Sequence, residues 1–376
     1  MKKSLLALAV LGAFAGAAQA QSSVTLYGIV DAGVLYTTGN QSAAAGAVAG
    51  QTGNRIGFQS GIEATNRWGI RGSEDLGGGL AATFALENGF SSATGGMLGN
   101  GAAGTGPVAG KLFDRGATVG LKGGFGSVTL GRNWSPFVLS QIAVDSNGFS
   151  NFGSLNSLAF QATSANPVAQ GFSYYWVDNS IVYNTPSFSG FDASLLYGFG
   201  NVAGDNGAGR TWSLSGKYAN GPLTVAAGYF DSKNNGALVN GAAVPTTESG
   251  QRAWHIGGKY NFGVATAHVE FANYKNPFQS DLFNTDFWSI GAAAPIGTNM
   301  VFLANWIHKK DKNVSDRNAD LFKFAVDYNF SKTTTAYVNL GFTRNKRLGN
   351  TGLLNSGYTV AGENQTALGV GLRKAF

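Results

Sequence analysis

The chain is a long series of short segments in which apolar and polar side chains alternate. Over residues 24–34 an apolar or small residue stands at every even position, and Thr25, Tyr27 and Asp31 stand between them. The same period of two returns over residues 212–218, 322–330 and 336–342. Alternation places successive side chains on opposite faces of a strand and does not fit the period of a helix. We therefore predict an all-β protein.

The connections between these segments alternate in length. Long stretches rich in Gly, Asn, Ser and Ala, such as residues 37–54 and 234–250, alternate with short turns. The short turns are Asp75-Leu76-Gly77-Gly78-Gly79, Gly123-Gly124-Phe125-Gly126, Ser187-Phe188-Ser189-Gly190, Asn220-Gly221-Pro222 and Gly297-Thr298-Asn299. Short turns at one end and long loops at the other are typical of transmembrane β-barrels. The segments number about sixteen, an even count as bacterial barrels require, and no domain boundary interrupts them.

Composition supports a membrane barrel over an exported β-sandwich or propeller, which would also alternate. Glycine supplies 56 of 376 residues and charged residues only 12%, whereas a soluble surface is more charged. Tyr218, Tyr260, Tyr328 and Phe330 stand beside short turns, where an aromatic girdle would meet the membrane interface. The chain stops on Phe376, in step with Leu372. Because unpaired backbone groups are costly in hydrocarbon, the last strand must pair with the first.

The N-terminus predicts export. Lys2 and Lys3 precede an apolar run over residues 5–15 that leads to Ala18-Gln19-Ala20. This pattern is typical of a signal peptide over residues 1–20, which leaves residues 21–376 as a single barrel domain. The alternative, an anchoring helix, would need a run of about 20 apolar residues. There is no cysteine, which excludes disulfides and thiolate metal sites, and no basic run indicates a nucleic-acid partner.

Several stretches of the mature chain carry a more specific pattern. It opens Gln21-Ser22-Ser23-Val24-Thr25-Leu26-Tyr27-Gly28 and ends Gly371-Leu372-Arg373-Lys374-Ala375-Phe376. Between these ends stand, in order, Arg67-Trp68-Gly69-Ile70-Arg71-Gly72-Ser73-Glu74-Asp75-Leu76-Gly77, Phe84-Ala85-Leu86-Glu87-Asn88-Gly89-Phe90, Phe113-Asp114-Arg115, Leu130-Gly131-Arg132 and Asp178-Asn179-Ser180-Ile181-Val182-Tyr183. Together they resemble the general-diffusion porins of Gram-negative bacteria, especially the beta-proteobacterial branch.

The resemblance implies a sixteen-stranded outer-membrane barrel, a homotrimer, and a third loop folded into the lumen, here within residues 133–174. It implies a passive channel for small ions and hydrophilic solutes, with no cofactor and no metal. The expected partners are outer-membrane lipids, lipopolysaccharide and the barrel assembly machinery, which would read Phe376 as an assembly signal.

The alternation also predicts residues of the pore constriction. Trp68 and Ile70 take the apolar face, so Arg67 and Arg71 should point into water. The resemblance adds Arg115 as a wall arginine and acidic residues on the third loop, where Asp145 is the only carboxylate over residues 133–174. Three arginines against one aspartate predict a preference for anions. Each such charge could instead be merely solvated or paired.

Two further features qualify this site. The family usually has an arginine just before Asn179-Ser180, and this chain has Tyr175-Trp176-Val177-Asp178 there. Arg132 is in step with the outer-face residues Val128 and Leu130, unless a bulge at Gly131 turns it inward. We leave Arg132 out of the predicted site.

Other functions remain open at this level. One is a structural or receptor-like barrel with a plugged lumen. Another is a substrate-specific channel for sugars or carboxylates, for which Phe149, Phe152 and Phe160 on the third loop could line the path. We expect no enzymatic activity, because His255 and His268 should face the lumen without an adjacent acid or serine pattern that suggests a catalytic triad.

Overall fold

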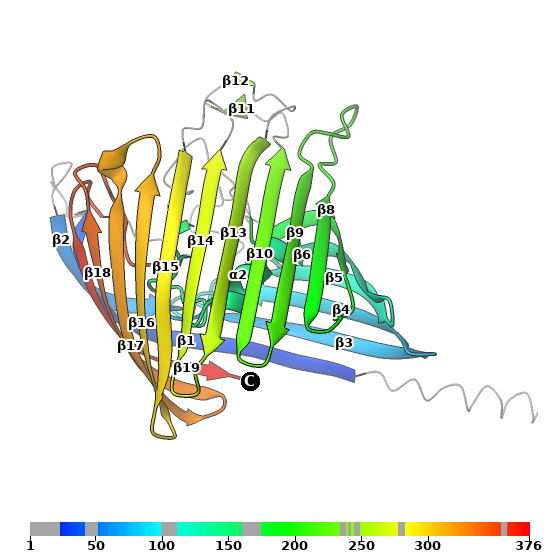
Figure 1. Ribbon diagram of the computed structural model, residues 1–376, viewed down its shortest axis with the longest axis horizontal. Helices are drawn as coiled ribbons and strands as arrows, with labels where there is room; N and C mark the ends of the chain where they lie inside the picture. The colour runs from blue at the N-terminus through cyan, green and yellow to red at the C-terminus, as the bar shows by residue number, and fades with distance from the viewer. Residues whose placement is uncertain are drawn as a thin grey trace, which may run out of the picture.

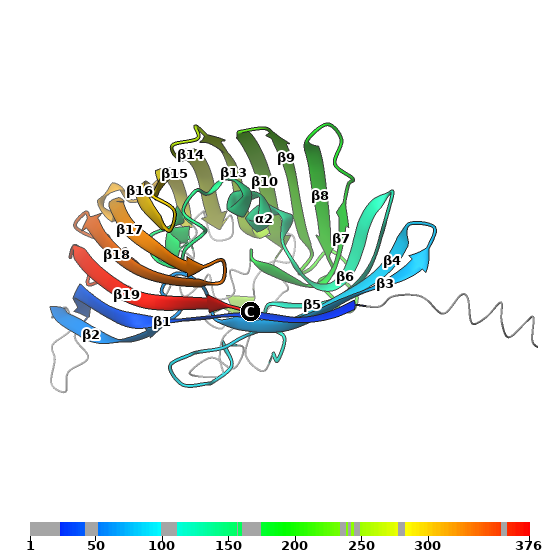
Figure 2. The ribbon, with the colours of Figure 1, turned by 90° about the horizontal axis from the view of Figure 1, so that it is seen from below.

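The computed structural model describes residues 23–41, 52–98, 111–155, 157–159, 174–233, 238–239, 242–243, 249–276, 283–354 and 359–376. The predicted signal peptide lies outside these residues. The chain forms a closed antiparallel barrel (Figures 1 and 2). Its strands are β1 (Ser23–Gln41), β2 (Thr52–Ser60), β3 (Arg67–Gly77), β4 (Leu80–Gly89), β5 (Gly116–Gly123), β6 (Gly126–Trp134), β7 (Trp176–Asn184), β8 (Phe191–Gly198), β9 (Thr211–Asn220), β10 (Leu223–Lys233), β13 (Ser249–Asn261), β14 (Thr266–Asn276), β15 (Phe283–Ile296), β16 (Met300–Asp311), β17 (Ala319–Ser331), β18 (Thr334–Asn345) and β19 (Gln365–Ala375).

The seventeen strands of the barrel occupy sixteen positions around it, because β2 and β3 follow one another along the same position beside β1. Both pair with β1, with Ser60 opposite Ala32 and Arg67 opposite Ile29. Between them, residues 61–66 fold against the inner wall, where Ile62 is fully buried. The count of sixteen strands is thus confirmed, and this inward insertion is a feature that the alternation did not predict.

The barrel closes between its first and last strands, as predicted. β1 pairs with β19 from Ile29 opposite Ala375 to Thr37 opposite Ala367. Phe376 extends this seam, since its carbonyl accepts the Gly28 N–H at 3.0 Å and its N–H donates to the Gly28 carbonyl at 3.1 Å. A Cβ on Gly28 would lie 2.4 Å from Cζ of Phe376, so the contact requires glycine there.

The two faces of the wall differ as the alternation predicted. Val24 and Val34 are more than half exposed on the outside, whereas Asp31 between them is fully buried on the inside. Two rows of outward aromatic side chains run over β7 to β18, one near each end of the barrel. Near the long loops lie Trp212, Trp254, Phe271, Trp288, Trp306, Phe322 and Phe342, and near the short turns lie Tyr183, Phe191, Tyr218, Tyr260, Phe302, Tyr328 and Phe330. Such rows are typical of membrane interfaces.

Short turns gather at one end of the barrel, the turn end, and long connections at the other, the loop end (Figure 1). All five short turns predicted from the sequence join neighbouring strands. The loop end carries the hairpin of β11 (Leu238–Val239) and β12 (Ala242–Ala243) and the short helix η2 (Ser315–Arg317). No helix in the described part of the chain is long and apolar enough to cross a membrane.

The third long loop, between β6 and β7, turns back into the lumen and carries helix α2 (Pro136–Val144) (Figure 2). Ser135 caps this helix by accepting the Val138 N–H at 3.3 Å, and Pro136 supplies the first turn. Phe137 and Val138 are fully buried. Phe137 packs against Phe230 of β10 and Tyr274 of β14. The helix therefore lies on the inner wall, as the resemblance implied for this loop.

Candidate pore constriction

Hydrogen bonds to the wall hold the third loop in the lumen. Oγ of Ser140 lies 2.6 Å from Nε2 of His255, and Oγ of Ser146 lies 2.6 Å from Nδ1 of His268. Gln141, which follows Ser140 in α2, donates to Oε1 of Glu270 of β14 at 2.9 Å. His255 and His268 thus face the lumen, as predicted, and contact the loop.

The loop then crosses to the opposite side of the barrel. The Asn151 N–H donates to the Glu63 carbonyl at 2.9 Å, which attaches the loop to the insertion over residues 61–66. Nδ2 of Asn305 donates to the Gly153 carbonyl at 3.2 Å. Phe152 is fully buried here, Phe149 is partly buried, and Phe160 lies outside the described residues. Of the three aromatic residues considered for a solute path, Phe152 therefore belongs to the packing of the loop.

Asp145 ends helix α2, and the loop itself engages its carboxylate. One oxygen accepts the Asn147 N–H at 2.7 Å and the other accepts the Phe149 N–H at 2.9 Å. The first oxygen also lies 3.9 Å from Nδ1 of His268. Among the described residues, Asp145 makes no hydrogen bond or ion pair with Arg67, Arg71 or Arg115. Whether Asp145 acts on permeating ions stays a prediction.

We expect Asp145→Asn to loosen the third loop more than it changes ion selectivity. Asparagine keeps one acceptor oxygen, so one of the two loop N–H groups loses its partner at a cost of about 1–3 kcal/mol. The thermal unfolding midpoint should fall, and the chloride-to-potassium permeability ratio should change less than about twofold, since a change of that size corresponds to well under 1 kcal/mol. A large rise in anion preference with an unchanged midpoint would show that Asp145 is a pore acid.

The three predicted wall arginines lie together on the far side of the lumen. Nε of Arg115 lies 2.6 Å from Oε1 of Glu87, and Nε of Arg67 lies 4.0 Å from Oε2 of the same carboxylate. Tyr27 donates to Glu87 at 3.1 Å, and the Arg71 guanidinium lies 5.0 Å from the centre of the Tyr27 ring. Glu87, which the sequence analysis did not place in the constriction, is therefore the shared partner of Arg67, Arg115 and Tyr27.

These arginines differ in their access to water. The Arg115 side chain is 5% exposed and that of Arg67 is 27% exposed. The Arg115 guanidinium lies 5.4 Å from the centre of Trp134 and 5.0 Å from that of Trp176. Aromatic faces and a carboxylate therefore hold Arg115 in place, while Arg67 and Arg71 reach the solvent of the lumen.

A fourth arginine joins them because of a β-bulge. The register between β6 and β7 shifts between Gly131 and Asn133, and Gly131 has a φ of 121°. Arg132 consequently points inward and donates to the Asp114 carbonyl at 2.7 Å. Its position on the outer face, inferred from strict alternation, is wrong, and the bulge that the glycine allowed is present. We call Arg67, Arg71, Arg115 and Arg132 the arginine wall.

Asp178 stands where the resemblance led us to expect an arginine, and it pairs with Arg132 at 2.5 Å and with Lys111. The group thus contains five cations (the arginine wall and Lys111) and three carboxylates (Glu87, Asp114 and Asp178), a net charge of +2. Arg115 and Arg132 of the arginine wall border a cavity of about 210 Å³, which Leu139 of α2 also lines.

Asp114 is the carboxylate of this group with the least access to water. It is almost fully buried, and burial raises the pKa of Asp114 above its usual value of 3.8. The Gly89 N–H, which donates to Asp114 at 2.7 Å, opposes this shift, as do the charges of Arg115 and Arg132. Acidification should therefore neutralise Asp114 earlier than an aspartate in water.

Within the described residues, no group of three or more His, Asp or Glu side chains is arranged to hold a metal ion. The cavity combines the guanidinium groups of Arg115 and Arg132 and the Glu87 carboxylate with an aliphatic residue of the loop, Leu139.

Comparison with known proteins places this geometry in context. The chain matches the family model for Gram-negative porins over residues 7–348. It is 36% identical to outer membrane porin protein 32 of Delftia acidovorans and 31% identical to an outer membrane porin protein of Bordetella pertussis, and each alignment covers 100% of both chains. The solved anion-selective porin from Comamonas acidovorans matches with a TM-score of 0.77 at 31% identity, over 95% of this chain and 100% of that one.

Proposed function

We propose, from the premise that this chain belongs to the family of Gram-negative porins, that its arginine wall makes its channel prefer anions. The protein forms a passive, water-filled channel across the outer membrane, as its family and its closed barrel indicate. The preference for anions is the part of this function that depends on individual side chains.

The observation that carries the proposal is the unequal charge on the two sides of the lumen. The wall group has a net charge of +2, and the only carboxylate in the described part of the third loop accepts two N–H groups of that loop. Guanidinium groups stay protonated at any relevant pH, so the positive potential of the wall persists. Charged rings in a pore select ions through this potential. The solved relative from Comamonas acidovorans is an anion-selective porin, which supports the proposal.

Solute flux through liposomes separates this function from its alternatives. We expect small sugars to pass at rates that fall with size and do not saturate with concentration. Saturation would instead favour a substrate-specific channel. No flux through correctly folded barrels would favour a structural or receptor-like barrel with a plugged lumen. The described part of the third loop supports an open pore, since α2 packs on the wall formed by β9, β10 and β13.

The pH dependence of selectivity tests the place of Asp114 in this site. Because burial raises the pKa of Asp114, a fall in pH from 7 should neutralise it before ordinary aspartates and make the wall more positive. We expect the chloride-to-potassium permeability ratio, obtained from reversal potentials between pH 7 and pH 4, to rise as the pH falls. In Asp114→Asn the ratio should be raised already at pH 7. A ratio that falls on acidification would contradict this assignment.

We further propose that the protein is a homotrimer in contact with outer-membrane lipids and lipopolysaccharide, exported by cleavage after residue 20. A role of Phe376 in recognition by the barrel assembly machinery is supported by its position at the turn end, where the residue is 53% exposed and its ring lies against the outward Gly28. We expect no enzymatic activity, because the family consists of channels. The two lumen histidines, His255 and His268, contact the third loop. The lack of enzymatic activity stays a prediction.

A further inference from the structure

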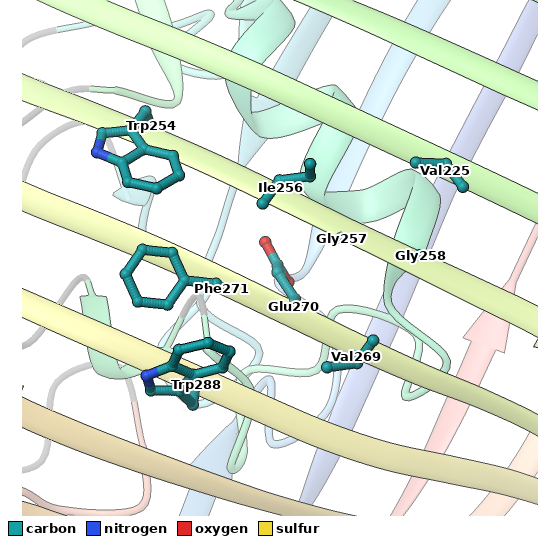
Figure 3. Close-up of a pocket in the computed structure, with 9 residues that line it drawn as sticks. All are labelled: Val225, Trp254, Ile256, Gly257, Gly258, Val269, Glu270, Phe271 and Trp288. Carbon is teal, nitrogen blue, oxygen red and sulfur yellow. The ribbon is translucent and has the colours of Figure 1, made fainter.

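A groove interrupts the outer face of the barrel over β10, β13, β14 and β15 (Figure 3). Its volume is about 590 Å³. Its sides are formed by Trp254 and Ile256 of β13, Val269 and Phe271 of β14, and Trp288 of β15. These side chains all face away from the lumen, so the groove is separate from the pore.

The groove exists because its floor lacks side chains. Gly258 of β13 is the outward position here, and it stands between Val225 of β10 and Val269 of β14. The adjacent Gly257 faces the lumen, where a Cβ would lie 2.9 Å from Cγ2 of Val144 in α2. A Cβ on Gly258 would lie 3.5 Å from the Thr224 carbonyl oxygen and 3.7 Å from Cγ2 of Val225, which are ordinary contacts. Glu270, seen beside the floor in Figure 3, belongs to the lumen side, where it accepts a hydrogen bond from Gln141. The surface open to the outside is therefore apolar.

The groove lies at the depth of the acyl chains. Trp254 and Trp288 belong to the aromatic row near the loop end, and Tyr260, six residues after Trp254 on β13, belongs to the row near the turn end. Outward positions between two such rows face hydrocarbon. An open apolar groove at this depth has to be filled by an acyl chain or by another protein.

Positive charge lies directly beyond the groove toward the loop end. Arg252 precedes Trp254 on the outward face of β13, and Lys275 of β14 stands opposite Arg252. Lys310 of β16 stands opposite Asp286 of β15. With Lys312 this outward patch has four cations against the two carboxylates Asp231 and Asp286. Arg252 pairs with Asp231 at 2.8 Å and Lys312 with Asp286 at 3.5 Å, while Lys275 and Lys310 form no ion pair with any described residue.

We propose that this groove binds one acyl chain of the lipopolysaccharide of the outer leaflet, and that Lys275 and Lys310 bind the phosphates of its lipid A headgroup. Long loops of such barrels face the cell exterior, so the basic patch lies at the outer surface of the membrane. The occupant thus needs a chain long enough to fill an apolar groove and a phosphate directly above it. A second copy of this chain would match the apolar part but gives no reason for two lysines at one end that have no ion pair among the described residues. The proposal rests on the proposed contact with lipopolysaccharide and not on ion selectivity.

The test uses the purified full-length barrel in detergent and a hexa-acylated, bis-phosphorylated lipid A, with bound lipid counted by native mass spectrometry. Gly258→Leu fills the groove from its floor and should weaken binding about tenfold, because the chain loses most of its apolar contact. Gly216→Leu is the matched control. Gly216 is an outward glycine of β9 where a Cβ would lie 3.6 Å from Phe191, outside the groove. Its binding should equal that of the unaltered protein.

Two further measurements separate the headgroup from the chain. Lys275→Gln should weaken binding of bis-phosphorylated lipid A about threefold to tenfold, and dephosphorylated lipid A should bind both proteins equally weakly. Inorganic phosphate at millimolar concentration should not displace the lipid. Displacement by phosphate alone would show a simple anion site and overturn the role of the groove.

Equal binding by Gly258→Leu and the unaltered protein would also overturn the proposal. If Gly258→Leu instead dissociates the oligomer, measured by light scattering, the groove is an interface between copies and the lipid assignment is wrong. Single-channel conductance of Gly258→Leu should equal that of the unaltered protein, since the groove faces away from the lumen. This readout keeps a failure of the lipid site distinguishable from a failure of the pore function.

Discussion

Replacing Arg67, Arg71 and Arg115 together by glutamine should remove the anion preference of the channel. The substitutions take three positive charges from a group whose net charge is +2 and leave it at −1. Each charge contributes about 0.6 kcal/mol to an ion about 7 Å away in water, with opposite sign for chloride and potassium. After screening by salt, the permeability ratio should fall about tenfold or more and pass to the cation side.

The control for this experiment keeps the net charge constant. Glu87→Gln combined with Arg115→Gln removes one charge of each sign from a pair at 2.6 Å, so the permeability ratio should stay within about twofold of the original. If the triple variant folds poorly, Arg67→Gln combined with Arg71→Gln can be measured in its place. Both arginines have access to water, so the permeability ratio of this double variant should be intermediate. An unchanged ratio in the triple variant would mean that selectivity arises elsewhere in the pore.

Of the substitutions considered, Asp31→Ala should lower the free energy of unfolding most. Its fully buried carboxylate accepts the Glu63 N–H at 3.0 Å, the Ala64 N–H at 2.7 Å and the Tyr337 hydroxyl. These bonds hold the insertion over residues 61–66 against the seam between the first and last strands. Without the carboxylate three buried donors lose their partner, so the free energy of unfolding in urea should fall by about 3–5 kcal/mol.

Asp192 offers the matched comparison for this loss. It is also a strand carboxylate, but its pair with Lys217 at 3.1 Å is about one-third exposed on both sides. Asp192→Ala should therefore lower the free energy of unfolding by no more than about 1 kcal/mol. If Asp31→Ala and Asp192→Ala lose equal amounts, the buried network at the seam does not stabilise the barrel as the geometry indicates.

The fold could be predicted from the sequence because its main determinant is local. A period of two fixes which face of each strand meets hydrocarbon, and glycine-rich turns fix where strands end. The positions of Arg67 and Arg71 followed from Trp68 and Ile70 in the same way. The insertion over residues 61–66 did not follow, because it is held by contacts with Asp31 and Asn151, which lie far away in the sequence.

The site was only partly predictable for the same reason. Strict alternation placed Arg132 on the outer face, and the bulge at Gly131 turns its side chain into the lumen. The glycine allows such a bulge but does not by itself predict one. The loop residue Asp145 has no strand period to orient it. Its carboxylate turned out to accept N–H groups of its own loop, and Glu87 of β4 is the acid beside the arginines.

The most direct measurement of the central claim is the reversal potential of single channels in a planar bilayer under a KCl gradient. The arginine wall group has a net charge of +2, and the carboxylate of the third loop is bound by N–H groups of that loop. We therefore predict reversal on the chloride side, with steps in threes if the protein is a trimer. Reversal on the potassium side would leave the porin fold intact and contradict the role assigned to the arginine wall.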